Sequence, residues 1–520
     1  MRKPLVLILC VVSLGVFGQR KKDRDTSSLI FQPKRVEFEV GKYDEDYTII
    51  NGEDDGLMLV VQTYAKIEGK YAWQLAKLDT DLNEVWRKSV LVSLTATMLG
   101  YEYFDGKFYV LVSESQYRTQ DMVVYEIDVD GNIQTFEITT VFPISLAYFE
   151  VIGETLLLGG NVNARPVIIT YGLEERKPKV LPGFYDNRNE ILDVVIDDEE
   201  LMFTVILRER LVSKQYSVRA KTFTAEGFLV QDLLVESGER RNLIDAASTN
   251  FESGIQMLAG AHSKRSTSYS KGLYLAKFVN GRQQFIEYHN YADLENFFGF
   301  MSDKREQRIK RRIERRKQMG KKNKFNYRLI VHDMIQNDDG VNIMVGEAYY
   351  PRYTSSSGFG SPYPYGGYGG RFTGPSSSFL GFKYTHTIVV AFDNNGKIIW
   401  DHSFKIQDAL TYSLQKFVSV SYFDDQIVLM YLDENEIRSK IVQGNEVIEG
   451  QTFNPVKLSN QNEEVKSKNP EIEGLDHWYD NNFYAFGLHN LTDVSKGNFW
   501  SSRKVFYINK IEYDRQRSVN

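Results

Sequence analysis

The chain has 520 residues, of which 42% are hydrophobic and 13% aromatic, and its formal net charge is −6. This composition excludes a disordered chain, and the mild acidity argues against a nucleic-acid partner for the protein as a whole. Tyr and Phe number 32 each while Pro numbers 12, and abundant flat aromatic side chains favour β-strands.

The first 18 residues predict an export signal peptide. Arg2 and Lys3 give a positive start, the run from Leu5 to Val16 is apolar, and Gly18 precedes the expected cut before Gln19. A retained membrane anchor is the alternative, but the apolar run is shorter than the roughly 20 residues that cross a bilayer. We therefore expect an exported protein of the periplasm or outer membrane, with the cell surface also open.

The only cysteine, Cys10, lies inside this signal segment. Acylation of Cys10 as a lipoprotein is the less favoured reading, because Leu9 stands where that processing needs a small residue. If the cut follows Gly18, the mature chain contains no thiol, and it forms no disulfide and no cysteine-ligated metal site.

Short apolar strands, each introduced by a polar turn rich in Asp, Asn or Gly, recur along the rest of the chain. In chain order these strands are Gly56–Val61, Lys107–Val112, Thr155–Leu158, Leu201–Ile206, Gly254–Ala259, Val341–Val345, Gln426–Met430 and Phe483–Phe486. Such regular recurrence indicates a repeat architecture.

A polar hairpin between two further strands follows many of these apolar strands. The hairpins are Leu78–Trp86, Ile127–Ile133, Phe223–Phe228, Phe278–Arg282 and Phe392–Trp400. Each unit thus reads as a four-stranded antiparallel sheet, with a spacing of roughly 45–55 residues, as in a propeller blade. The sequence predicts one all-β domain over 19–520, a β-propeller of eight four-stranded blades, with seven blades as the alternative.

The two ends of the chain fit a closed ring. The last unit offers only three strands, over Ile472–Trp478, Asn482–Leu488 and Val505–Tyr513, and Leu29–Val40 is a spare extended stretch before the first full unit. Pairing Leu29–Val40 with the last blade would remove two bare sheet edges. The alternative is an ordinary leader strand, and two independent β-sandwiches would overturn the whole scheme.

The hairpin from Asp393 to Trp400 resembles those of PQQ-like and related propeller repeats. With Gln19 after the signal cut, the whole mature chain resembles exported propellers of Bacteroidota envelopes. The resemblance implies the fold and the export, and it carries over no functional residue.

A basic insertion, 303–324, interrupts the repeat. Ser302 and Gly320 are suited to begin and end a helix, and Ile309 and Ile313 form only a narrow apolar stripe. We expect this helix to attach to the body mainly at its start, through aromatic residues and Met301. The cations of the insertion are Lys304, Arg305, Arg308, Lys310, Arg311, Arg312, Arg315, Arg316, Lys317, Lys321, Lys322 and Lys324, and the attaching aromatics are Phe297, Phe298 and Phe300.

Two interpretations of this helix stay open. The first is an electrostatic docking element for anionic lipid, lipopolysaccharide or an acidic protein face, with Arg308, Arg311, Arg312, Arg315, Arg316 and Lys317 as the candidate interaction residues. The second is a solvated helix supported by pairs such as Glu306 with Lys310 and Glu314 with neighbouring arginines.

A second insertion, 349–382, is rich in Tyr, Gly and Ser and contains Tyr363, Tyr365 and Tyr368. These aromatic side chains are candidates for stacking on a glycan or binding a protein partner. A flexible low-complexity loop is the alternative.

No pattern predicts a catalytic, cofactor or metal site. Asp128–Asn132 resembles part of a calcium loop, but Thr139 stands where the loop needs a bidentate acid, so a hairpin is the better interpretation. The seven histidines are scattered without His-Glu-x-x-His, and neither a nucleophile elbow nor a phosphate-binding P-loop occurs, so each histidine is expected to be buried and satisfied.

The leading hypothesis is therefore a non-catalytic interaction or scaffold protein of the bacterial cell envelope, although enzyme activity stays open. The two insertions in consecutive units would form one docking face for an envelope or outer-membrane protein. The alternative is a carbohydrate-binding or carbohydrate-active propeller with a site at the central channel, which a cluster of acids and aromatics there would favour.

Overall fold

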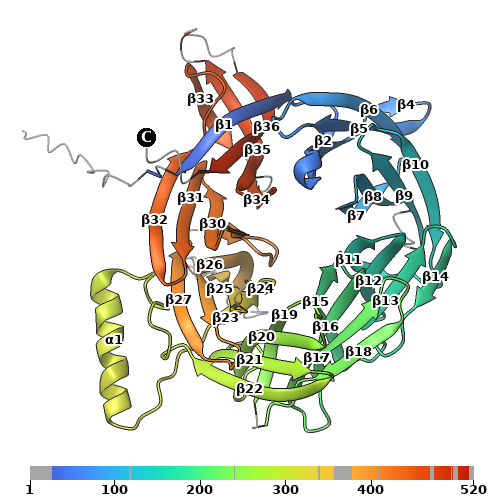
Figure 1. Ribbon diagram of the computed structural model, residues 1–520. Coiled ribbons are helices and arrows are strands. Elements are labelled where there is room, and N and C mark those ends of the chain that lie inside the picture. Colours follow the sequence, from blue (N-terminus) through green and yellow to red (C-terminus); the bar gives the residue numbers. More distant parts are fainter. Residues whose placement is uncertain are drawn as a thin grey trace, which may run out of the picture.

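The computed structural model describes residues 26–27, 29–115, 120–238, 241–337, 340–355, 377–407, 409–468, 473–493, 495 and 502–514. Eight antiparallel sheets in this part of the chain follow one another around a central axis (Figure 1). The protein is an eight-bladed β-propeller, and the alternatives of seven blades and of two sandwiches are wrong. The predicted signal peptide, with Cys10, lies outside the described residues.

We number the blades in chain order, and the strands of each blade run outward from the axis. Blade 1 contains β2 (Asp44–Asn51), β3 (Leu57–Thr63), β4 (Lys66–Ile67), β5 (Lys70–Leu78) and β6 (Glu84–Val92), with a short 3-10 helix at Glu53–Asp55. Blade 2 contains β7 (Thr97–Phe104), β8 (Lys107–Ser113), β9 (Asp121–Asp128) and β10 (Ile133–Thr139). Blade 3 contains β11 (Ser145–Ile152), β12 (Thr155–Val162), β13 (Arg165–Gly172) and β14 (Lys177–Val180). Blade 4 contains β15 (Asn189–Asp197), β16 (Met202–Arg210), β17 (Tyr216–Thr224) and β18 (Leu229–Leu234).

The remaining blades carry the helix and the longest strands. Blade 5 contains β19 (Asn242–Ser248), β20 (Ile255–Ser263), β21 (Gly272–Val279) and β22 (Arg282–Asn290), and helix α1 (Asp303–Gln318) follows it. Blade 6 contains β23 (Arg328–Val331), β24 (Ile335–Gln336), β25 (Asn342–Ser355), β26 (Ser377–Phe392), β27 (Ile398–Lys405) and β28 (Leu410–Thr411). Blade 7 contains β29 (Ser419–Phe423), β30 (Gln426–Asp433), β31 (Glu436–Gln443) and β32 (Glu446–Pro455). Blade 8 contains β33 (Glu463–Lys468), β34 (Gly474–His477), β35 (Asn482–Asp493), β36 (Ser502–Tyr513) and β1 (Ile30–Glu39).

The N-terminal strand closes the ring, as predicted. β1 pairs antiparallel with β36 from Ile30 opposite Tyr513 to Glu39 opposite Val505, with one irregularity between Phe31 and Lys34. Salt bridges also form where the ring closes, since the Arg503 guanidinium pairs with Glu37 of β1 and with Glu463 of β33. The first and last parts of the sequence therefore complete one sheet.

The second strand of each blade carries a run of buried side chains. In β3, for example, the side chains from Leu57 to Val61 are all buried, and the corresponding strand β30 is buried from Gln426 to Leu432. Neighbouring blades cover both faces of such a strand, which is why it appears in the sequence as an uninterrupted apolar run.

The predicted polar hairpins form the turns between outer strands. Gly131 adopts a φ of 80°, which favours glycine, and its N–H donates to the Asp128 carbonyl. The Asp128 carboxylate accepts from the backbone N–H and the side-chain amide of Asn132, each at 2.8 Å. The Asp128 carboxylate thus stabilises a turn, in agreement with the interpretation of this segment as a hairpin rather than as a calcium loop.

The innermost strands of blades 1 to 5 share one irregularity. Each skips one residue in its pairing with the second strand, and the skipped residues are Glu45, Leu99, Ala147, Leu192 and Ile244. Such bulges re-aim the side chains that follow them. The residues that follow are Asp46, Gly100, Tyr148, Asp193 and Asp245, at equivalent places around the axis.

Both insertions emerge on one face of the propeller. α1 lies in the connection from β22 to β23, and the 349–382 segment includes the end of β25 and the start of β26, which are adjacent strands of blade 6. Strand direction alternates within a blade, so the start of β23, the end of β25 and the start of β26 lie at the same end. Figure 1 shows α1 on the outer rim, beside blades 5 and 6. We call this end of the ring the α1 face.

Candidate functional site

Helix α1 begins and ends near the residues that the sequence indicates. Ser302 is the N-cap residue, and its carbonyl accepts the N–H groups of Arg305 and Glu306. At the other end Gly320 has a φ of 64°, and its N–H donates to the Lys317 carbonyl. This left-handed glycine terminates the helix.

The segment before α1 is fixed by aromatic packing. Phe300 stacks on His386 of β26, with ring centroids 3.7 Å apart and planes 7° apart. Phe297 meets the same imidazole edge-on at 5.0 Å and stacks on Tyr291 at 4.5 Å. Burial lowers the pKa of His386 to about 3, so the imidazole is neutral at physiological pH and packs as an apolar ring.

A carboxylate holds the same segment from the other side. Asp401 of β27 accepts the backbone N–H groups of Glu295 and Asn296, each at 2.7 Å, and the Asn296 amide donates to the Asp401 carbonyl. The path into α1 is therefore specified by blade 6 and does not depend on the helix itself.

The body also holds the middle of α1, which corrects the expectation that the helix attaches mainly at its start. Ile313 is buried in the core cluster between blades 5 and 6, and Ile309 packs against that cluster. After the helix, the Asn323 amide donates to the Ile313 carbonyl at 3.4 Å, and Arg316 donates to the Lys322 carbonyl at 2.6 Å. The narrow apolar stripe is sufficient to attach the helix, because the segment after α1 folds back along the helix.

The candidate cations on α1 divide into two groups. Arg308, Arg311, Arg312 and Arg315 are exposed, at i, i+3, i+4 and i+7, and make no salt bridge within 4 Å to any described residue. We call these four residues the arginine row. Arg316 is half-buried against the Lys322 carbonyl, and Lys317 pairs with Asp293 at 3.3 Å.

Of the two ion pairs expected within the helix, one forms. Glu306 pairs with Lys310 at 2.8 Å, as predicted. Glu314 makes no salt bridge within the described part of the chain, so that expectation is wrong. The helix thus gives its arginines little internal counter-charge.

The second insertion is a long hairpin at its base. β25 runs to Ser355 and β26 begins at Ser377, so both flanks of the 349–382 segment are paired strands. Tyr353 meets Phe379 edge-on at 5.6 Å, and Phe379 meets Phe382 at 5.0 Å. The candidate residues Tyr363, Tyr365 and Tyr368 lie outside the described residues.

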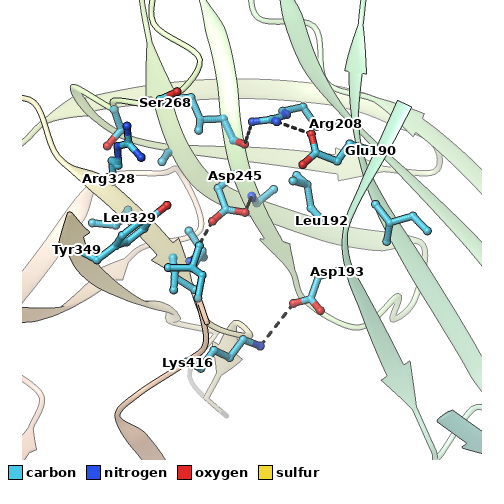
Figure 2. Close-up of a pocket in the computed structure, with 18 of the residues that line it drawn as sticks. Glu190, Leu192, Asp193, Arg208, Asp245, Ser268, Arg328, Leu329, Tyr349 and Lys416 are labelled. Atoms are coloured by element: carbon cyan, nitrogen blue, oxygen red, sulfur yellow. Dashed lines mark hydrogen bonds and ion pairs between the residues drawn. The ribbon is translucent and has the colours of Figure 1, made fainter. Parts of the chain in front are cut away.

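A cavity of about 510 Å³ opens at the axis between the inner strands of blades 4, 5 and 6, and the sequence analysis named none of its lining residues as site residues. Figure 2 shows its charged and aromatic lining. We call it the channel cavity, and its polar lining includes Tyr148, Glu190, Asp193, Arg208, Asp245, Ser268, Arg328, Tyr349 and Lys416.

Asp245 lies in the wall of this cavity and is held by the backbone. Its carboxylate accepts the N–H of Ala246 at 3.0 Å and that of Val331 at 3.1 Å. Burial raises the pKa of Asp245 to about 6. Arg208 reaches the same wall, where it pairs with Glu190 and donates to the Ile244 carbonyl at 3.4 Å.

Lys416 spans the channel side of the cavity. Its ammonium lies 3.5 Å from Asp193 of blade 4 and 3.1 Å from Asp333, which follows β23 of blade 6. Burial acts to lower the pKa of Lys416, but the two carboxylates outweigh it and raise the pKa. This lysine links three blades around the axis, since it lies just before β29 of blade 7.

Two glutamates of adjacent inner strands share a proton elsewhere along the channel. Glu102 of β7 and Glu150 of β11 are hydrogen-bonded to each other through their carboxyl groups. Burial and then the charge of Glu102 raise the pKa of Glu150 to about 9. The pair therefore carries one proton at neutral pH.

The sequence contains a signal for part of the channel lining. Tyr148, Asp193 and Asp245 are the residues that directly follow the bulges of blades 3, 4 and 5. A polar or aromatic residue at this position interrupts the apolar alternation of each inner strand. Lys416 has no such signal, because its reach across the axis depends on the closed ring.

The histidines follow the expectation only in part. His289, His402 and His477 each hydrogen-bond a backbone carbonyl, and His332 bonds Glu347 at 2.6 Å. By contrast, the Nε2 atoms of His262 and His386 are buried and lack a hydrogen-bond partner among the described residues. Within the described ranges, no group of three or more His, Cys, Asp and Glu side chains is placed to hold a metal ion.

No known protein family matches the sequence, and neither does any curated protein. Several solved propellers are similar in fold. The polysaccharide lyase Uly1 shares 10% identity at a TM-score of 0.38, over 93% of this chain and 100% of that chain. The Dos1 propeller shares 10% identity at 0.38, over 78% of each chain, and the propeller domain of the Trilobed protease from Pyrococcus furiosus shares 8% at 0.35, over 76% and 94%. These similarities bear on no site residue.

Proposed function

We propose that the protein is a non-catalytic, exported interaction protein of the bacterial cell envelope, which docks an acidic partner protein through the arginine row of α1. One observation carries the proposal. The arginine row is exposed and without a salt bridge among the described residues, yet it stands on a helix that the body fixes at its start and in its middle.

This combination favours docking over a merely solvated helix. A solvated helix needs internal ion pairs, and here the described pair within α1 is that of Glu306 with Lys310. A helix held in one position loses little conformational freedom when a partner binds, so its charges act as a preorganised surface. Partner carboxylates would also offset the mutual repulsion of the arginines.

The distribution of charge between the two ends of the ring supports docking of the acidic partner at the α1 face. The turns between first and second strands, at the end opposite the α1 face, carry exposed carboxylates at Asp54, Asp105, Asp198, Asp424 and Asp480. An acidic partner is therefore steered toward the α1 face and away from the other end. The export signal and the resemblance to exported PQQ-like propellers support an envelope setting, and the structure has no described helix of the length and apolarity needed to cross a membrane.

The test is co-purification from native envelopes with a charge-reversed helix. Arg308→Glu, Arg311→Glu, Arg312→Glu and Arg315→Glu are combined, and the matched control reverses Lys42, Lys66, Lys70 and Lys177, four exposed lysines away from α1. We expect the helix variant alone to lose its protein partner, and the wild-type interaction to weaken as salt exceeds about 150 mM. Equal recovery with both variants would refute the proposal, and retention on protein-free anionic vesicles would assign the row to lipid or lipopolysaccharide instead.

A second candidate function, carbohydrate binding in the channel cavity, is favoured by one observation. The cavity brings the carboxylates of Glu190, Asp193 and Asp245 together with the aromatic rings of Tyr148 and Tyr349. Carboxylates accept hydrogen bonds from sugar hydroxyls, and a flat ring can stack on a sugar face.

A glycan array and a hydrolysis screen test this candidate. We expect glycan binding to be lost in the double variant Asp245→Asn and Tyr349→Ala, and to persist in Tyr412→Ala, which alters an exposed tyrosine outside the cavity. Cleavage of a glycan by the wild-type protein would instead make the protein an enzyme.

A further inference from the structure

We infer that a cleft between the end of α1 and blade 5 binds a multiply charged phosphate group, as a phosphomonoester or diphosphate. The cleft has a volume of about 300 Å³ and opens on the α1 face. It is lined by seven cationic side chains and one carboxylate, and its charged lining residues are Arg241, Lys264, Lys271, Asp293, Lys317, Lys321, Lys322 and Lys324. We call it the lysine cleft.

The fold gathers these cations from separate segments. Arg241 precedes β19, Lys264 and Lys271 flank the turn between β20 and β21, and Lys317 ends α1. Lys321, Lys322 and Lys324 belong to the segment that turns back after the helix. Their convergence is therefore a property of the folded ring, because local sequence places only the last four together.

The backbone that carries the lysines is fixed. The Lys321 N–H donates to the Arg316 carbonyl at 2.9 Å, and the Lys322 carbonyl accepts from the Arg316 guanidinium. On the blade side, the Lys271 N–H donates to the His262 carbonyl at 2.8 Å. The lysine side chains thus start from defined positions around the cleft.

Among the described residues that line the cleft, the one carboxylate is already engaged. Asp293 accepts the backbone N–H and the side-chain amide of Asn290, each at 3.1 Å, and it pairs with Lys317 at 3.3 Å. It therefore closes the turn after β22 and neutralises one lysine. The remaining positive charge of the cleft exceeds what this carboxylate can balance.

The cations of the cleft also act on a neighbouring histidine. Burial is the largest cause that lowers the pKa of His262, to about 3, and the charges of Arg241 and Lys264 lower it further. A helix C-terminus attracts cations and explains some of the lysines after α1. It does not explain Lys264, Lys271 and Arg241, which come from other segments.

Two features of the cleft favour phosphate over carboxylate. Carboxylates are recognised best by a planar arginine fork, but the cleft contains only one arginine, and its guanidinium stacks over Tyr288 at 3.9 Å. Lysines act as point charges, which suit a group with a charge of about −1.5 to −2. A volume of about 300 Å³ lies at the small end of ligand sites, enough for one phosphorylated sugar rather than for a folded partner.

The inference goes beyond the proposed function, because the cleft contains no residue of the arginine row, and it is tested with different residues. The experiment is calorimetric titration of the full mature chain with pyrophosphate, inorganic phosphate and acetate. We expect pyrophosphate to bind, phosphate to bind more weakly, and acetate to bind at least about tenfold more weakly than pyrophosphate.

The variant Lys264→Gln, Lys321→Gln and Lys322→Gln should weaken pyrophosphate binding by about tenfold or more. The matched control is Arg308→Gln, Arg311→Gln and Arg312→Gln, which removes the same charge from the arginine row and should leave pyrophosphate binding within about twofold. Wild-type protein that does not bind pyrophosphate, or a control that loses as much affinity as the cleft variant, would overturn the inference.

Two further titrations distinguish whether the phosphate group belongs to a soluble sugar phosphate or to a lipid. Glucose 1-phosphate represents a soluble sugar phosphate, and phosphatidylcholine vesicles that contain phosphatidic acid represent a lipid headgroup. The cleft variant should lose whichever of the two the wild type binds. Loss of partner co-purification in the arginine-row variant, with pyrophosphate binding intact, would leave both proposals standing, and each can fail without the other.

Discussion

Phe300 and His386 stack with ring centroids 3.7 Å apart, and this contact joins the segment that leads into α1 to a central strand of blade 6. The two residues come from different repeats, and the imidazole is buried and neutral at physiological pH. The position of the basic helix is therefore set by a neighbouring blade.

Replacement Phe300→Ala should loosen the helix without unfolding the ring. Removal of a packed aromatic ring costs about 3–5 kcal/mol, but here the loss falls on a peripheral segment. Trypsin, which cleaves after Lys and Arg, should cut within Asp303–Gln318 at least about tenfold faster, while the global unfolding temperature falls by a few degrees at most. Tyr412→Ala, at a side chain 72% exposed, is the control and should leave cleavage unchanged.

The ring closure should depend on Glu37. Burial acts to raise the pKa of this carboxyl, but the hydrogen bonds and charges of Arg35 and Arg503 outweigh it, so the pKa is lowered. Glu37 therefore adds stability above its unfolded pKa of 4.5, and this stability is lost as the pH falls through the lower folded value. Glu37→Gln should destabilise the protein by about 2–3 kcal/mol at neutral pH and by much less in acid.

Denaturant unfolding at neutral and acidic pH measures the effect of Glu37→Gln. Glu39→Gln, at an exposed residue of the same strand, is the control. If the two variants lose the same stability at neutral pH, Glu37 has no special part in closure.

The proton held by Glu102 and Glu150 predicts a pH dependence of stability that is opposite in sign to that of Glu37. Because burial and Glu102 raise the pKa of Glu150 to about 9, the folded protein binds a proton that the unfolded chain releases above 4.5. The contribution of Glu150 is fully present below 4.5 and is lost as the pH rises through about 9. Glu150→Gln should therefore raise stability relative to wild type by about 2 kcal/mol near pH 9, and hardly at all near pH 4.

Thermal unfolding across this pH range tests the expectation. Glu137→Gln, at an exposed residue of β10, provides the control for loss of one carboxylate. A constant difference between Glu150→Gln and wild type from pH 4 to pH 9 would show that the two glutamates do not share a proton.

Lys416→Met should leave Asp193 and Asp333 without their shared cation. Because the lysine side chain is 39% exposed, we expect a loss of only about 1 kcal/mol, which Asp193→Asn in the same chain should partly restore. Chemical denaturation of the two single variants and the double variant measures the coupling. Strict additivity would mean that the ion pair contributes nothing.

Local pattern predicted the fold because each blade is specified by short-range features. The apolar run Leu57–Val61 and the Gly131 turn each identify one part of a blade, and the unpaired edges at the two ends predicted that β1 would pair with β36. Ser302 and Gly320 likewise mark α1 in the sequence itself.

The channel could not be predicted in this way. Glu102 meets Glu150, and Lys416 meets Asp193, only because the ring curves their strands toward a common axis. The lysine cleft depends on the same curvature, since Lys264 and Lys322 belong to different connections. The packing of Ile313 was underestimated because the return of Asn323 along the helix leaves no mark in the periodicity.

Sharing blade 8 between both ends of the chain has a consequence for biosynthesis. β1 is among the first described strands to leave the ribosome, and its partner β36 is the last. Until β36 is synthesised, the ring therefore stays open between the first and the last blade. During that interval the edges of β1 and β35, which both pair with β36 in the closed ring, are bare and able to pair with other chains. The ring therefore closes only after the final strand has been synthesised. A chain that stops before Ser502 can form most of its sheets and still be prone to aggregation.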